Sequence, residues 1–203
     1  MDYQRLVFTI GHSNHDFDFF LNLLQQHRIN CLVDVRSVAA STYNPQYNQL
    51  PLKNALNLQH IIYLHFKDEF GARQEDELVL DEEGLVRFEF VQRTPIFKRG
   101  VNRLENGLEK GYRIALMCSE ADPLDCHRFS MIARYLVKEE IEIFHILKDG
   151  TLRSHQALEQ DLLKKYEKKL PQPSLFAPQI TAKDKLQVAY QLHNQEIGWR
   201  VEQ

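Results

Sequence analysis

Short apolar runs alternate with helical patterns along the first 170 residues of the chain. Five runs have the length and composition of buried strands, at 6–10, 31–35, 61–66, 114–117 and 141–146. Between them, apolar residues recur at the spacing of a helix face, as in Phe17, Phe20, Leu21 and Leu24. Strands that alternate with helices predict an α/β fold, a three-layer domain with a largely parallel sheet and helices on both faces.

The pattern changes near residue 170, where prolines begin to interrupt regular structure. Pro171, Pro173 and Pro178 indicate an exposed linker over 171–180, and one more helix is possible over 182–193. We therefore expect a single domain over 1–170, followed by a linker and C-terminal tail over 171–203. The polar and acidic stretch at 67–94 is expected to form a long solvated loop.

Composition places the chain among folded globular proteins, with 43% hydrophobic and 26% charged residues. A formal net charge of −3 argues against a surface that is basic throughout, although a local basic cleft is compatible with it. Three cysteines and no signal peptide indicate a reducing, cytoplasmic location. No apolar run approaches the roughly 18 residues that a membrane span requires, so we expect no membrane association.

Polar and ionisable residues follow four of the predicted strands. Because ligands in such sheets bind beyond the carboxyl ends of the strands, these residues are expected to converge on one pocket. The segments concerned are Gly11-His12-Ser13, Asp34-Val35-Arg36-Ser37, His65 with Lys67, and Cys118-Ser119-Glu120.

The expected pocket contains three arginines, Arg36, Arg73 and Arg128, which suggest what it binds. Guanidinium groups match phosphate and carboxylate geometry, and a helix that begins near Cys126 would direct backbone N–H groups to the same place. We therefore expect a small anionic or nucleotide-like ligand. The expected ligand-binding residues are Ser13, Asp34, Arg36, Ser37, Arg73, Cys126 and Arg128. Asp34 and Arg36 lie on the same side of a strand, so they could equally form a structural ion pair.

The expected catalytic residues are His12, Glu120, His127 and Cys118. Glu120 and the two histidines could exchange protons with a substrate. The eight-residue separation of Cys118 and Cys126 is unlike the close ligand pairs of common metal sites, so we assign no metal ligand and no cofactor. Cys118 at a strand end loosely resembles the cysteine of rhodanese-like sulfurtransferases, but the following loop lacks their glycines. A buried, unreactive Cys118 is the other interpretation.

The order of these motifs resembles that of the domain of unknown function 488 family. The resemblance covers about residues 5–150 and combines Gly-His-Ser, Asp-Val-Arg-Ser and Gly-Ala-Arg with Cys-x-Glu and Cys-His-Arg. It implies a fold and a site, but no reaction. Ser41-Thr42-Tyr43 stands where the family has basic and small residues, and Ala72 where it has a second glycine. Both departures argue against an identical ligand.

The tail contains a separate motif. Gln172, Leu175 and Phe176 resemble the pentapeptide by which bacterial proteins bind the DNA sliding clamp, in which Leu-Phe fills an apolar pocket. Alternatively, Leu175 and Phe176 dock onto the protein's own core. Lysines at 164, 165, 168 and 169 form a small basic cluster, so direct nucleic-acid binding stays open. Three hypotheses result: an enzyme acting on a phosphate-bearing or nucleic-acid-derived substrate, a binding module recruited to DNA, and a sulfurtransferase.

Overall fold

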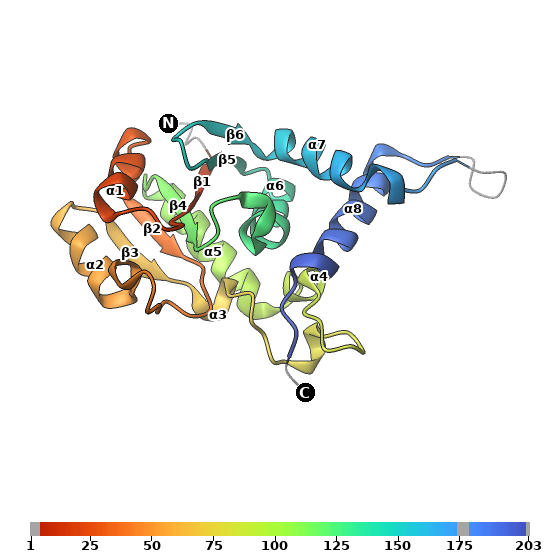
Figure 1. Cartoon of the computed structure of the whole chain (residues 1–203), viewed down its shortest axis with the longest axis horizontal. Helices are drawn as coiled ribbons and strands as arrows, with labels where there is room; N and C mark the ends of the chain where they lie inside the picture. The colour runs from red at the N-terminus through yellow and green to blue at the C-terminus, as the bar shows by residue number, and fades with distance from the viewer. Residues whose placement is uncertain (1–4, 174–178, 202–203) are drawn as a thin grey trace.

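A six-stranded sheet in the order β3-β2-β4-β1-β5-β6 forms the centre of the computed structural model, which describes residues 5–173 and 179–201 (Figure 1). Five strands run parallel and match the predicted runs to within one residue at each end: β1 (Leu6–Gly11), β2 (Cys31–Asp34), β3 (Ile62–His65), β4 (Ile114–Cys118) and β5 (Glu142–Ile146). The sixth, β6 (Leu152–Ser154), pairs antiparallel with β5. The predicted largely parallel sheet is confirmed.

Helices cover both faces of the sheet, which confirms the predicted three layers. On one face, α1 (Phe17–Gln26) and α2 (Gln49–Leu58) pack their buried residues, among them Phe20, Leu24 and Leu52, against Phe8 and Ile10 of β1. On the other face lie α5 (Pro95–Glu109) and the helix after His127. The side chain of Asp16 caps α1 and that of Thr94 caps α5, where Pro95 takes the first helical position.

The stretch at 67–94 is not the continuous solvated loop that its polar composition predicts. It contains two short helices, α3 (Lys67–Phe70) and α4 (Phe88–Val91), and a 3₁₀ turn at Glu77–Val79. Phe70, Val79 and Phe88 are buried in the core, and these few anchors hold the otherwise exposed acidic segment against the domain. Widely spaced anchors of this kind have no period that a sequence pattern can reveal.

The helix after His127 begins with an unusual turn. Residues Arg128–Ala133 form a π-helix, and α6 (Arg134–Lys138) continues it as an ordinary helix. The helical pattern predicted after residue 127 is therefore confirmed, but the apolar spacing did not indicate its wider first turns. Segments of π-helix are rare in proteins, and those that occur often lie at functional sites.

The C-terminal region returns to the domain. Helix α8 (Ala182–Ile197) packs on α7 (His155–Tyr166), and together with Phe129 they form a third apolar cluster. Beyond α8, the N–H of Val86 donates to the carbonyl oxygen of Trp199. The helix expected over 182–193 is present and longer than predicted. Within the described ranges, no helix has the length and apolar character needed to cross a membrane.

A chain of buried hydrogen bonds links the sheet to α8. Nδ1 of His145 lies 2.8 Å from the Thr9 hydroxyl, and its Nε2 lies 3.2 Å from Nδ1 of His155. The Tyr190 hydroxyl lies 2.9 Å from Nε2 of His155 and donates to Glu159 at 3.0 Å. Burial lowers the pKa of His155 to about 3 and that of His145 well below its usual value. Both histidines are therefore neutral in the folded protein.

We predict that the free energy of unfolding decreases as the pH falls below about 6.5, the ordinary histidine pKa, because the unfolded chain then binds protons that the folded chain excludes. His145 and His155 should each contribute about 1 kcal/mol per pH unit. Urea denaturation at pH 7.0 and 5.5 measures the effect. The His155→Gln variant should show a weaker pH dependence, and equal pH dependence in both proteins would contradict this explanation.

Candidate functional site

A small cleft of about 150 Å³ lies at the carboxyl ends of β2 and β4, and we call it the strand-end cleft. Six of the predicted site residues line it, together with four others: Arg36, Ser37, Arg73, Cys118, Glu120 and His127, with Val38, Ala72, Ser119 and Trp199. The predicted convergence at the sheet edge therefore holds for this subset. His12, Ser13, Asp34, Cys126 and Arg128 are not among the lining residues.

The loop that connects β4 to the π-helix is held by the guanidinium of Arg128, which is fully buried. Its Nη1 donates to the carbonyl oxygen of Glu120 at 2.7 Å, and its Nη2 donates to that of Ala121 at 3.1 Å. The loop crosses the end of β1 so closely that a Cβ on Gly11 would stand 1.8 Å from the Glu120 oxygen. Arg128 thus fixes the loop and does not face the cleft as an anion-binding group.

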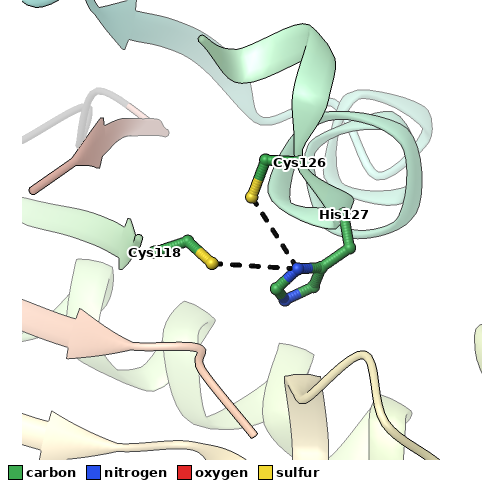
Figure 2. Close-up of side chains that lie close together, drawn as sticks. All are labelled: Cys118, Cys126 and His127. Atoms are coloured by element: carbon green, nitrogen blue, oxygen red, sulfur yellow. Dashed lines mark hydrogen bonds between the residues drawn. The ribbon is translucent and has the colours of Figure 1, made fainter. Parts of the chain in front are cut away.

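This folded loop brings Cys118, Cys126 and His127 together (Figure 2). Cys118 ends β4, whereas Cys126 and His127 directly precede the π-helix. Nδ1 of His127 lies 3.7 Å from the sulfur of Cys126 and 3.9 Å from that of Cys118. The three ligand atoms all lie within 4.8 Å of one another, and all three residues are buried. The eight-residue separation that disfavoured a metal site in the sequence does not keep these atoms apart.

The orientation of His127 is set by its other nitrogen. Nε2 lies 3.1 Å from the carbonyl oxygen of Val35, and since a carbonyl can only accept, Nε2 carries a proton. Nδ1 points at both sulfurs; it carries a proton in the charged ring and a lone pair in the neutral ring. Val35 lies inside the Asp-Val-Arg-Ser motif, but the sequence assigned it no role, because its backbone rather than its side chain makes the contact.

The pKa values of the two thiols are shifted in opposite directions. Burial opposes ionisation of Cys126, but the hydrogen bond from Cys118 and the positive charges of Arg128 and His127 lower its pKa well below the ordinary value. The same hydrogen bond, with burial, raises the pKa of Cys118. Burial alone would lower the pKa of His127, but the charge on Cys126 raises it. The backbone N–H of Arg128 also donates to the Cys126 sulfur at 3.4 Å.

Asp34 and Arg36 form a buried ion pair beneath the cleft. Arg36 donates through Nε at 2.9 Å and Nη2 at 2.7 Å to the Asp34 carboxylate, which also accepts from the Tyr63 hydroxyl at 2.6 Å. The Nη2 group of Arg36 donates in addition to the carbonyl oxygen of Tyr47 at 2.7 Å. Most of the charge of Arg36 is therefore matched within the protein, although the residue still lines the cleft.

His12 supports this ion pair from the side. Its Nδ1 lies 2.7 Å from the carbonyl oxygen of Ser13, and its Nε2 lies 3.1 Å from Nη1 of Arg36. Burial, with the nearby positive charge of Arg36, lowers the pKa of His12 to about 4. His12 is therefore neutral at pH 7 and uses both nitrogens inside the protein. Its geometry fits a residue that positions Arg36, whereas the predicted proton-transfer role has no free nitrogen to perform it.

The mouth of the cleft carries the exposed groups. The backbone N–H of Arg73 donates to the Ser37 hydroxyl at 2.9 Å. Arg73 itself is exposed and lies at the rim of the cleft. Desolvation by the surrounding residues raises the pKa of the Glu120 carboxyl, and the negative charge on Cys126 raises it further. Trp199, the single tryptophan, reaches the cleft from the C-terminal tail, and no motif in the sequence linked it to the site.

The family model described as "Domain of unknown function DUF488" matches residues 16–136, more than half of the chain. The chain belongs to this family. The matched region includes Asp34, Arg36, Glu120 and the Cys118–Cys126–His127 cluster, whereas Trp199 lies beyond it. No curated protein and no solved structure matches the chain. Because the family description names no activity, the chemistry has to be inferred from the site.

The Asp34→Ala variant should be destabilised by about 3–5 kcal/mol, because the buried guanidinium of Arg36 would lose its counter-ion. Tyr63→Phe removes only one hydrogen bond to the same carboxylate and should cost about 2 kcal/mol. Urea denaturation of both variants measures the difference. A smaller loss for Asp34→Ala than for Tyr63→Phe would contradict a structural role for the ion pair.

Proposed function

We propose that the protein is a metal-dependent enzyme that acts on a small anionic substrate in the strand-end cleft. Cys118, Cys126 and His127 would hold a divalent cation of the zinc class. The observation that carries the proposal is the convergence of two sulfurs and one imidazole nitrogen on a common point beside the cleft.

The distances support a tetrahedral site. Zinc lies about 2.3 Å from a cysteine sulfur and about 2.0 Å from a histidine nitrogen, so tetrahedral angles separate S and N by about 3.5 Å. The observed separations of 3.7 and 3.9 Å between Nδ1 of His127 and the two sulfurs exceed this value by only a few tenths of an ångström. Small side-chain rotations would suffice to close the site around a cation.

The surroundings of His127 support the same assignment. A metal-binding histidine commonly donates its other ring N–H to a carbonyl or carboxylate, which fixes the tautomer and orients the ring. Nε2 of His127 has such a partner in the carbonyl oxygen of Val35. The nitrogen that faces the sulfurs is thereby the one available for coordination.

Three protein ligands leave a fourth position for water or substrate, as in catalytic zinc sites. Cys118 and His127 line the cleft, so this position would open toward it. A cation there would activate a bound water molecule or polarise a substrate oxygen. Glu120, at the same cleft, would accept or deliver the proton. A hydrolytic or related acid–base reaction is therefore the reaction class that we propose.

The substrate's charge is inferred from the cations of the cleft. Arg73 has its guanidinium exposed at the rim, and Arg36 contributes part of the lining. Arg128, which was also predicted to bind the anion, is occupied by two backbone carbonyls. Because the cleft measures only about 150 Å³, it would accept the reacting group of a substrate whose remainder lies outside.

Purified protein should bind one zinc ion per chain, and Cys118→Ser, Cys126→Ser and His127→Gln should each weaken binding at least 100-fold, because even loss of a supporting hydrogen bond costs about 10–100-fold. Competition with a chelating dye measures the affinity. Cys31→Ser is the matched control, since Cys31 is buried in β2 outside the cluster and should have no effect. Equal zinc affinity in all variants would refute the proposal.

The Glu120→Gln variant separates coordination from proton transfer. It should bind zinc as tightly as the unaltered protein, because its carboxylate is not among the three ligand groups. Turnover of any substrate found by screening small phosphate and carboxylate esters should fall at least 100-fold with the loss of an acid–base group. A loss of zinc binding in this variant would make Glu120 a ligand instead.

Metal-free thiol chemistry is the second candidate, and it keeps the sulfurtransferase alternative. Its support is that Cys118 and His127 line the cleft, and that the Cys126 sulfur lies beside the His127 ring. In this case the metal-free protein would be the active form. Activity retained in Cys118→Ser would exclude it.

Recruitment to a DNA sliding clamp and a cytoplasmic location stay proposals. Gln172 is exposed, as a partner-binding residue requires, whereas Leu175 and Phe176 lie outside the described residues. Replacing 172–176 by glycine and serine at equal length tests clamp binding in a pull-down and preserves the connection to α8 and Trp199.

A further inference from the structure

A second pocket, of about 400 Å³, lies between α4, α5, α6 and α8. It shares no lining residue with the strand-end cleft. Its lining contains four cations and one carboxylate. The lining residues are Arg93, Lys98, Arg134 and Lys138, with Glu89, Gln92, Tyr135 and Gln187. The chain as a whole carries a net charge of −3, so this pocket is a local concentration of positive charge in an acidic protein.

Arg134 is the deepest of the four cations and is 8% exposed. Its guanidinium lies over the ring of Tyr190, 4.1 Å from the centroid, and donates to the side-chain oxygen of Gln187. In the described part of the chain, no carboxylate lies within ion-pair distance of it. A buried charge is normally paired, so an unpaired guanidinium at the wall of a pocket indicates a place for an external anion.

The nearest carboxylates already have other partners. Glu89 accepts from Arg87 at 3.2 Å and from Gln187 at 3.3 Å, and Glu159 accepts from the Tyr190 hydroxyl at 3.0 Å. The amide of Gln92 donates to the carbonyl oxygen of Met131 at 2.7 Å. Both carboxylates favour the charged forms of Arg134 and Lys138 from a distance, but within the described residues neither forms an ion pair with a cation of the pocket.

The pKa of Lys138 is lowered by burial and by the positive charges of Arg134 and Lys183, which outweigh the opposing effect of Glu89 and Glu159. Burial likewise lowers the pKa of Arg134. A bound anion would relieve this repulsion, and arginine and lysine together provide both bidentate and point-charge contacts for phosphate oxygens.

We infer that this pocket is a second binding site, separate from the proposed metal centre, and that it takes a phosphate-bearing anion. The volume suits a chain of two or three phosphate groups better than a single small ion. Free polyphosphates and a nucleic-acid backbone present the same oxygens to these cations, and the experiment below distinguishes the two sources. The inference does not depend on the metal centre.

The test compares tripolyphosphate with a 12-nucleotide single strand by calorimetric titration. The double variant Arg93→Gln/Lys98→Gln removes two exposed charges of the pocket and should weaken binding at least tenfold. Lys53→Gln/Lys110→Gln removes two exposed charges elsewhere, outside the basic cluster at 164–169, and is the matched control. Cys118→Ser, which changes only the strand-end cleft, should keep the binding that Arg93→Gln/Lys98→Gln loses. Arg134→Met is a further variant, used once its fold is verified by circular dichroism.

Each outcome is decisive. Tripolyphosphate binding that only the pocket variants lose supports a site for free polyphosphates. Tighter binding of the oligonucleotide, with the same variant pattern and a steeper salt dependence, identifies the anion as a nucleic-acid backbone. The inference is overturned if neither probe binds, or if the pocket and control variants bind equally well.

Discussion

The buried guanidinium of Arg128 determines the geometry on which the site depends. By donating to the carbonyl oxygens of Glu120 and Ala121, it closes the loop after β4 across the end of β1, where only glycine at position 11 leaves room. This closure returns Cys126 and His127 to the end of the strand that carries Cys118. Arg128 can hold two carbonyls in one orientation because its planar guanidinium has several fixed donors.

The rest of the cleft is assembled from segments that the sheet brings to the same edge. The Asp34–Arg36 pair, braced by Tyr63 and His12, forms a rigid base, since each of its buried polar groups has a partner. The segment after α3 contributes Arg73, and the C-terminal tail contributes Trp199. Rigid ligands and a preformed base suit a catalytic metal centre, where the geometry must exist before the substrate binds.

Sequence patterns predicted the sheet and most helices because apolar periodicity reflects burial directly. The same patterns located the edge at which Arg36, Cys118, Glu120 and His127 meet, because parallel strands end together. They did not reveal that Arg128 turns inward, that His12 uses both nitrogens, or that Val35 and Trp199 take part. Those facts depend on backbone carbonyls and on tertiary contacts, which leave no trace in residue type or spacing. The proximity of Cys118, Cys126 and His127 was missed for a related reason: the distance between two cysteines along a folded loop says little about their distance in space.

X-ray absorption spectroscopy of the zinc-loaded protein tests the proposed centre most directly. Coordination by Cys118, Cys126 and His127 predicts two sulfur neighbours at about 2.3 Å and two nitrogen or oxygen neighbours at about 2.0 Å. The Cys31→Ser variant should give the same spectrum, and Cys126→Ser should lose one sulfur neighbour. A spectrum with only nitrogen and oxygen neighbours would contradict the metal centre and move the chemistry of this cleft to the free thiols.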